Sequence, residues 1–402
     1  MVVPLNSPQP VFELPPLSDI PDEYEDSPVP GIQPNAEKIG PLQLPELVFG
    51  AAAFSSQYNI AEHLSSTVPL RTVRLALRYG IRAFDTSAYY GPSEIVLGAA
   101  LRALAPEFPR ESYQLLTKCG RYGATKEDFD YSPETIRKSV ERSLARLNTT
   151  YLDVVYLHDI EFISDYVQAQ LTGDHAIALT PDNAGDYGLA LGQEAKVWGA
   201  GDRQVLAAVA ELRKLQKKGF IKYIGLSGYP LPTLLRLALL VQHTELEGEK
   251  QPVDVLMSYS HLHLQNDTFK NFVAHFHDRA RIPQLLTASP LNMGLLTPSP
   301  PIWHPAPPVL RDTVKEASAE CEREGWEDGL VNLALGFAYR EAKNLGLPTV
   351  VGLSKPSEVH ETIRIWRELR SPNEALNNKR AESEKTFQKR LGELRNYSWA
   401  SP

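Results

Sequence analysis

From Leu47 onward, short apolar runs alternate with longer stretches in which apolar side chains recur every three to four residues. A short apolar run is typical of a buried strand, and the longer period is typical of a half-buried helix. Val140, Leu144 and Leu147 show the helical spacing. The predicted strands cover residues 47–51, 82–85, 114–118, 152–157, 223–226, 253–257, 284–288 and 349–351.

Predicted helices follow each of these strands. They cover residues 72–79, 93–103, 133–147, 204–217, 231–241, 267–279, 330–343 and 357–369. Alternation of strand and helix indicates a parallel sheet with right-handed crossovers, and eight strands close a barrel that side chains fill. We therefore predict the α/β class and a (β/α)8, or TIM, barrel. The alternative is a doubly wound dinucleotide-binding sheet, which needs Gly-x-Gly-x-x-Gly after its first strand. Here Gly50 is followed by three alanines.

Two long segments interrupt or precede this pattern. Residues 1–45 are rich in proline and acidic residues, and the first basic residue is Lys38. Because proline fixes φ and removes a backbone donor, we expect an extended N-terminal arm, either disordered or lying on the barrel. Residues 160–202, after the fourth strand, are too long for an ordinary βα loop. This insert leaves the barrel on the side where active sites lie, so we expect it to cover the site.

The C-terminal part contains a stiff loop and a tail. Six prolines within residues 297–310 predict a rigid loop after the seventh strand. Residues 371–402 form a polar, charged tail with a helical stretch near residues 382–394. We therefore divide the chain into the arm, a barrel domain over residues 46–370, and this tail.

Composition limits the partners and the cellular compartment that we expect for the protein. The formal net charge of −8 argues against a nucleic-acid partner, which would favour a basic face. The two cysteines, Cys119 and Cys321, cannot form a disulfide framework, so we expect a reducing compartment. The sequence has neither the pattern of a signal peptide nor a long apolar run that would span a membrane. We expect a cytoplasmic protein; the pattern does not predict its oligomeric state.

Reactive side chains gather at the predicted carboxyl ends of strands, where barrel enzymes place catalytic groups. Asp85, Lys118 and His158 end the second, third and fourth strands, and Tyr90 follows closely after Asp85. Singly, each has a structural explanation, such as capping a turn or reaching solvent. Together they form a working set. A lysine ammonium lowers the pKa of a nearby phenol, a carboxylate keeps the amine protonated, and a neutral imidazole orients or relays a proton.

These residues resemble the aldo-keto reductase family, and the resemblance covers roughly residues 45–370. The motifs are Phe84-Asp85-Thr86 with Tyr90-Gly91, Thr117-Lys118, Leu157-His158, Ser289-Pro290-Leu291 with Gly294-Leu295, and residues 351–355 with Glu358-Val359. The resemblance implies hydride transfer with a nicotinamide cofactor. It also implies that Tyr90 is the general acid/base, that Asp85 holds Lys118 beside it, and that His158 positions the reacting oxygen.

The same resemblance implies a set of cofactor contacts. These are Ser227, Ser289, Pro290, Leu291, Gly294, Leu295, Gly352, Ser354, Lys355, Glu358 and Thr362. Three positions depart from the family pattern. Gly228 replaces the asparagine that usually follows the serine, Ala288 replaces the aromatic residue that often stacks on nicotinamide, and the glutamine expected at the end of strand six is not evident.

Glu358 stands where NADP-preferring members of the family carry a basic residue. A carboxylate accepts hydrogen bonds from a ribose 2′-hydroxyl and repels a 2′-phosphate. We therefore predict NAD as the cofactor. NADP stays open, because Lys355 is close and Glu358 would also suit a solvated helix surface.

Segments 155–161 and 225–231 resemble the aldose-dehydrogenase branch of the family. This resemblance implies oxidation of an aldose such as D-arabinose at C1 to the aldonolactone, as in routes to erythroascorbate and related antioxidants. Phe54, Tyr122 and Asp159 are candidates to line the sugar pocket.

Three other interpretations fit parts of the sequence. The same tetrad would serve an NADPH-dependent reductase of aldehydes or ketones. A barrel that binds nicotinamide as a regulatory subunit, without turnover, is a second alternative. A metal site is a third, because His261/His263 and His275/His277 form His-x-His pairs; with no third ligand at metal spacing, we predict none.

Overall fold

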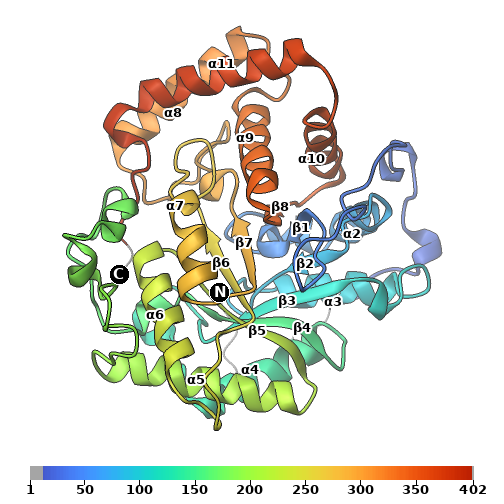
Figure 1. Ribbon diagram of the computed structural model, residues 1–402. Helices are drawn as coiled ribbons and strands as arrows, with labels where there is room; N and C mark the ends of the chain where they lie inside the picture. The colour runs from blue at the N-terminus through green and yellow to red at the C-terminus, as the bar shows by residue number, and fades with distance from the viewer. Residues whose placement is uncertain (1–11, 401–402) are drawn as a thin grey trace.

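Eight parallel strands close into a barrel in the computed structural model, which describes residues 12–400 (Figure 1). Each strand pairs with the next along the chain, and the first pairs with the last. The prediction of a (β/α)8 barrel is therefore confirmed. The strands are β1 Leu47–Gly50, β2 Ala83–Asp85, β3 Gln114–Cys119, β4 Leu152–His158, β5 Ile221–Gly228, β6 Val255–Tyr259, β7 Gln284–Ala288 and β8 Thr349–Gly352.

The apolar runs form strands because both of their faces are buried, as is usual in parallel sheets. One face fills the barrel interior, with Val48, Leu116, Tyr156 and Leu286 among its members. The other face packs against the surrounding helices. The barrel is therefore a solid core, and ligands reach only its ends.

The helices around the barrel agree closely with the predicted ones. They are α2 Val68–Arg78, α3 Ser93–Ala103, α4 Pro133–Arg146, α5 Ala200–Lys217, α6 Leu231–His243, α7 Phe269–Ala274, α9 Gly329–Leu345 and α10 Pro356–Glu368. The predicted helix over 267–279 differs most, because it continues from α7 as a π-helix over His275–Arg279. None of the helices described is long and apolar enough to cross a bilayer.

Helix α8, Pro308–Arg323, was not predicted, and helix α11, Glu374–Leu391, begins well before the predicted stretch. The two helices lie side by side above α9 and share a second apolar core with it (Figure 1). The start of α8 was not predicted because the prolines that precede it are typical of a loop. Pro308 is the first residue of this helix, a position where proline is favoured because its missing N–H has no helical partner.

The amino-terminal ends of the strands are closed by a hairpin from the arm. Ile39 and Leu44 pair antiparallel, and Leu42 and Leu44 are buried against the barrel interior. Gln114, at the start of β3, donates a 2.7 Å hydrogen bond to the carbonyl of Leu42. This end of the barrel is therefore sealed, and the opposite end carries the open cavity.

The rest of the described arm lies along α2 and α10 (Figure 1). Its carboxylates meet the arginines of α2. Asp26 is fully buried and accepts two 2.8 Å hydrogen bonds from Arg71, while Arg74 lies 3.7 Å away. On α10, Arg367 donates to the carbonyls of Val29 and Ile32. Acidic residues thus attach an otherwise irregular segment to a basic helix face.

The insert after β4 consists of short 3-10 turns and reaches the end of the chain. Gly173 pairs antiparallel with Ser398, through two main-chain hydrogen bonds of 2.9 Å each. In Figure 1 the marked C-terminal end accordingly lies among the green ribbons of the insert. Asp202, at the other end of the insert, forms a buried ion pair of 2.7 Å with Arg236 of α6.

We expect Asp26→Ala to lower the free energy of unfolding by about 3 kcal/mol, because it removes the buried carboxylate that lies against both Arg71 and Arg74. Glu25→Ala is the matched control. Glu25 pairs with the same Arg71 but is 61% exposed, so its loss should cost about 0.5 kcal/mol. Urea unfolding of both variants measures the difference. Equal losses would show that burial of Asp26 contributes nothing.

Candidate active site

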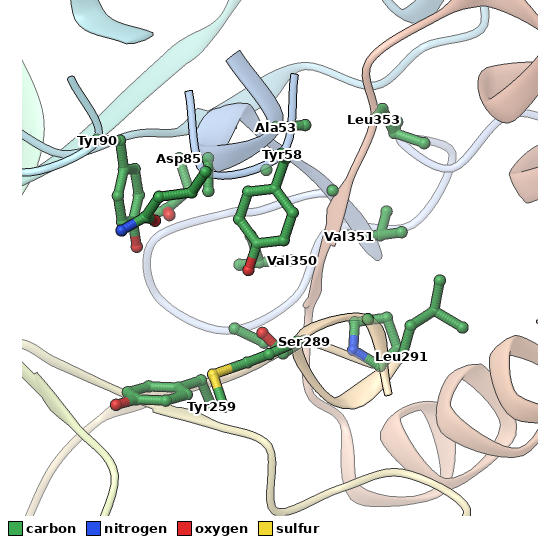
Figure 2. A pocket seen from close by; sticks show the side chains of 18 of the residues that line it. Ala53, Tyr58, Asp85, Tyr90, Tyr259, Ser289, Leu291, Val350, Val351 and Leu353 are labelled. Carbon is green, nitrogen blue, oxygen red and sulfur yellow. The ribbon is translucent and has the colours of Figure 1, made fainter. Parts of the chain in front are cut away.

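An elongated cavity of about 830 Å³ opens at the carboxyl ends of the strands. Figure 2 shows Asp85 and Tyr90 at one end of it and Leu291, Val351 and Leu353 at the other. All four members of the predicted tetrad line the first end. The cavity therefore connects the candidate catalytic groups to the ends of β7 and β8.

Lys118 is the centre of the tetrad. Its ammonium donates to Asp85 Oδ1 at 2.6 Å and to the carbonyl of Thr86 at 2.9 Å, and the side chain is 1% exposed. The same nitrogen lies 4.7 Å from the centre of the Tyr90 ring. The Tyr90 and His158 rings meet edge to face at 5.6 Å. Strands β2, β3 and β4 thus bring acid, amine, phenol and imidazole together, as the sequence predicted.

The expected acidification of Tyr90 is wrong for the protein chain alone. Burial raises the pKa of the Tyr90 phenol well above its usual range, and the charges of Asp85 and Asp159 raise it further. Burial is the larger cause, and Asp85 also pairs with Lys118 at 2.6 Å, so the carboxylate offsets the ammonium near the phenol. The structure therefore favours Tyr90 as a protonated phenol, ready to donate.

His158 is held as a neutral imidazole. Burial lowers its pKa well below the usual range, and the positive charges of Lys118 and Arg121 lower it further. Its Nδ1 lies 2.9 Å from the hydroxyl of Ser87, which fixes the ring orientation. The main-chain carbonyl of His158 also accepts a 2.7 Å hydrogen bond from Tyr131. A fixed neutral imidazole suits a role in orienting a substrate oxygen.

The second end of the cavity is built from the turns after β7 and β8. It contains most of the predicted cofactor contacts: Ser289, Pro290, Leu291, Gly294, Gly352, Ser354, Lys355, Glu358 and Thr362. Ser289 has a φ of 60°, in the left-handed region, so the chain turns sharply as it leaves β7. Leu295 does not line the cavity but is fully buried in the core with α8 and α9.

The lining offers unpaired polar atoms at both ends, which fits an elongated ligand such as a dinucleotide. Near the tetrad, the buried Ser227 hydroxyl has no partner among the residues described. At the far end, the same holds for Oε1 of Glu361. Burial raises the pKa of Glu361 to about 7, aided by the charges of Asp328 and Glu358. Glu361 was not among the predicted contacts, although it directly precedes the predicted Thr362.

An aromatic ring is present beside the position where the family pattern is broken. Ala288 pairs in register with Tyr259 of β6. Tyr259 lines the cavity, and Figure 2 shows its ring at the wall, below Tyr90 in this view. Strand β6 thus places an aromatic ring beside Ala288, the position on β7 where the family often has an aromatic residue. Strand register decides this proximity, which is why the sequence alone did not reveal it.

Only one of the three predicted sugar contacts lies at the cavity wall. Asp159 lines it. Phe54 is instead fully buried against Phe49, and the hydroxyl of Tyr122 accepts a hydrogen bond from the Gly120 amide, away from the cavity. Several aromatic and basic residues that line the cavity were not predicted: Tyr58, Tyr89, Arg121, Phe162, Trp303 and Trp399.

Trp399 is the least expected of these residues, because it belongs to the tail. Its ring stacks on Tyr229 at 4.7 Å and meets His304 edge to face at 5.0 Å. The bridge between Gly173 and Ser398 holds this segment in place. The insert and the chain end therefore build one wall of the site together.

The histidine pairs do not form a ligand cluster. His261 and His263 are buried, and burial lowers the pKa of both. His277 donates a 2.8 Å hydrogen bond from Nδ1 to the carbonyl of Ile282. Within residues 12–400, no group of three or more His, Cys, Asp or Glu side chains is arranged to hold a metal.

Comparison with known proteins agrees with this geometry. The profile of the Aldo/keto reductase family matches residues 46–378. The chain belongs to this family. It is therefore an NAD(P)-dependent oxidoreductase that acts on a small molecule.

Two relatives of this aldo/keto reductase match over most of their length. D-arabinose 1-dehydrogenase of Saccharomyces cerevisiae is 34% identical over 371 residues, which cover 91% of this chain and 97% of the relative. L-galactose dehydrogenase of Arabidopsis thaliana is 33% identical over 336 residues, covering 82% and 86%. Among solved structures, an aldo-keto reductase from Bacillus halodurans superimposes with a TM-score of 0.56 at 19% identity, covering 87% and 95%. At that identity the likeness supports the fold alone.

We expect the kcat/KM of this aldo/keto reductase for oxidation to rise with pH and to show no inflection near pH 6.5. The rise follows because a buried phenol with a raised pKa must lose its proton before it can act as a base. The imidazole contributes no step because the pKa of His158 lies well below its usual value. Initial rates from about pH 5.5 to 10 measure the profile. An inflection near pH 6.5 that His158→Gln abolishes would contradict the neutral imidazole.

Proposed function

We propose that this aldo/keto reductase oxidises the hemiacetal carbon of an aldose, such as D-arabinose, to the aldonolactone. The observation that carries the proposal is the gathering of Asp85, Tyr90, Lys118 and His158 at one end of a cavity that extends to the turns after β7 and β8. The printed activities of the two relatives, D-arabinose and L-galactose dehydrogenation, support the same substrate class.

The chain's own residues account for the proton in this reaction. The nicotinamide, when bound, supplies the site that accepts the hydride from C1. Tyr90 takes the proton of the C1 hydroxyl, and Lys118 lies under its ring to stabilise the phenolate that acts as base. Asp85 accepts a hydrogen bond from Lys118 and so fixes its ammonium. His158 donates to or accepts from the same oxygen and so aligns it.

The reverse reaction uses the same groups, with Tyr90 donating its proton to a carbonyl oxygen. The raised pKa of Tyr90 in the chain alone favours this protonated form. Reduction of aldehydes or ketones is therefore the second candidate function. A regulatory role without turnover fits less well, because every member of the tetrad is in contact with another.

We expect Tyr90→Phe to lower kcat for aldose oxidation by about 10²- to 10⁴-fold, because general acid/base catalysis supplies an effect of that size. The assay offers NAD with D-arabinose and L-galactose and follows the absorbance of the reduced cofactor. Tyr113→Phe is the control, since Tyr113 is buried beside Phe84 outside the cavity. Unchanged turnover in Tyr90→Phe would remove Tyr90 from the mechanism.

We further propose that NAD is preferred over NADP. Glu358 and Glu361 both line the far end of the cavity together with Lys355, which lies 3.9 Å from Glu358. Oε2 of Glu358 accepts hydrogen bonds from the amide and hydroxyl of Ser354, at 2.7 and 3.0 Å, so the carboxylate is fixed in place. A 2′-phosphate would meet this fixed negative charge, whereas a 2′-hydroxyl would donate to it.

We expect Glu358→Gln to reduce the NAD/NADP ratio of kcat/KM by about tenfold, because it removes one repulsive charge near the 2′ position. Titration of both cofactors at saturating substrate measures the ratio. Glu327→Gln is a control, because Glu327 is 74% exposed and does not line the cavity. A wild-type preference for NADP would overturn the proposal.

A further inference from the structure

An ion pair outside the tetrad forms part of the cavity wall beside it. Arg121 follows Lys118 by three residues, and Asp159 directly follows His158. The guanidinium Nη1 of Arg121 contacts Oδ2 of Asp159, and this oxygen lies 3.7 Å from Nε2 of His158. Both residues line the cavity. The pair therefore lies next to the group that aligns the reacting oxygen.

Asp159 presents an unused acceptor. The residue is 1% exposed, and its Oδ1 makes no hydrogen bond to any side chain or main-chain group in the described part of the protein. A buried carboxylate oxygen that accepts no hydrogen bond destabilises the protein, and a bound ligand that donates to this oxygen would remove that cost. Asp159 also has a φ of 54°, a conformation that non-glycine residues adopt at a cost and that is frequent at functional sites.

Arg121 is held rigidly by aromatic rings. Its guanidinium lies 3.9 Å from the centre of the Tyr89 ring and 5.1 Å from that of Phe162. Its Nε donates to the carbonyl of Gly123 at 3.1 Å. Because the guanidinium cannot swing away, the carboxylate that it pairs with is also fixed. Burial raises the pKa of Asp159, and the charge of Arg121 opposes that rise by favouring the ionised form.

The chemistry of the pair selects a neutral, hydroxylated ligand. A substrate anion would compete with Asp159 for Arg121, and a hydrocarbon would leave Oδ1 without a donor. Two neighbouring hydroxyls fit, because one can donate to the carboxylate while the other accepts from the guanidinium. His158 aligns the oxygen on C1, so the hydroxyl beside the pair is the one on the adjacent carbon.

We propose that the Arg121–Asp159 pair is a specificity subsite that binds the hydroxyl next to the reacting carbon, and so selects aldoses over simple hemiacetals, alcohols and aldehydes. This inference rests on the proposed function and deepens it. The competing explanation is that the pair only positions His158, in which case its loss would slow all substrates equally.

The experiment compares D-arabinose with tetrahydropyran-2-ol, a cyclic hemiacetal that has the reacting hydroxyl but no other, using NAD. In Asp159→Asn, the ratio of kcat/KM for D-arabinose to that for tetrahydropyran-2-ol should fall by about tenfold or more. The asparagine keeps the size of the side chain and presents a donor in place of an acceptor. 2-Deoxy-D-ribose, which lacks the C2 hydroxyl, should be affected less than D-arabinose.

Glu161→Gln is the matched control. It makes the same carboxylate-to-amide change two residues away, at a buried side chain that accepts from the Tyr229 amide and does not line the cavity. Its substrate ratio should stay at the wild-type value. Arg121→Lys provides a second test of the pair and should lower the ratio in the same direction. An equal fall for both substrates in Asp159→Asn would overturn the subsite.

A wild-type enzyme that oxidises no aldose would instead contradict the proposed function. The proposed subsite is then tested in the direction of reduction, by comparing kcat/KM for D-glyceraldehyde with kcat/KM for propanal. Asp159→Asn should lower the preference for D-glyceraldehyde, which carries a hydroxyl next to its carbonyl carbon. An unchanged preference would overturn the subsite independently of the aldose assay.

Discussion

The buried pair between Lys118 and Asp85 is the interaction on which the site depends. An ammonium taken out of water needs a partner charge and further acceptors, and Lys118 finds them in Asp85 and the carbonyl of Thr86. The pairing fixes the ends of β2 and β3 relative to each other. Tyr90 and His158 are then placed around one fixed cation, so the chemistry follows from strand register.

Neutralisation also has a consequence for the protonation state of the site. Burial raises the pKa of Tyr90, and the charge of Asp85, which offsets that of Lys118, raises it further, so Tyr90 favours its protonated form. The second ion pair, Arg121 with Asp159, is likewise nearly neutral in sum. Two rigid, balanced pairs thus surround a neutral imidazole. The site is polar in detail but carries little net charge, which suits an uncharged polyhydroxylated molecule.

Periodicity in the sequence was sufficient to predict the eight strands and most helices. The tetrad was predicted from the reactive residues at strand ends together with the family resemblance. It failed where a feature depends on distant segments. Helix α8 was also not predicted, because the prolines before and at its start are typical of a loop. Tyr259 and Ala288 become neighbours only through sheet pairing. Trp399 reaches the cavity only because the tail folds back against the insert, which no local pattern encodes.

The bridge between Gly173 and Ser398 joins two segments that are far apart in the sequence, the insert and the end of the tail. The insert positions the chain end, and the chain end carries Trp399 to the cavity. Replacing either segment alone with that of another barrel would break the pairing and displace the ring. Anyone who grafts a new substrate preference onto this scaffold must therefore exchange residues 160–202 and the last few residues of the chain as one piece.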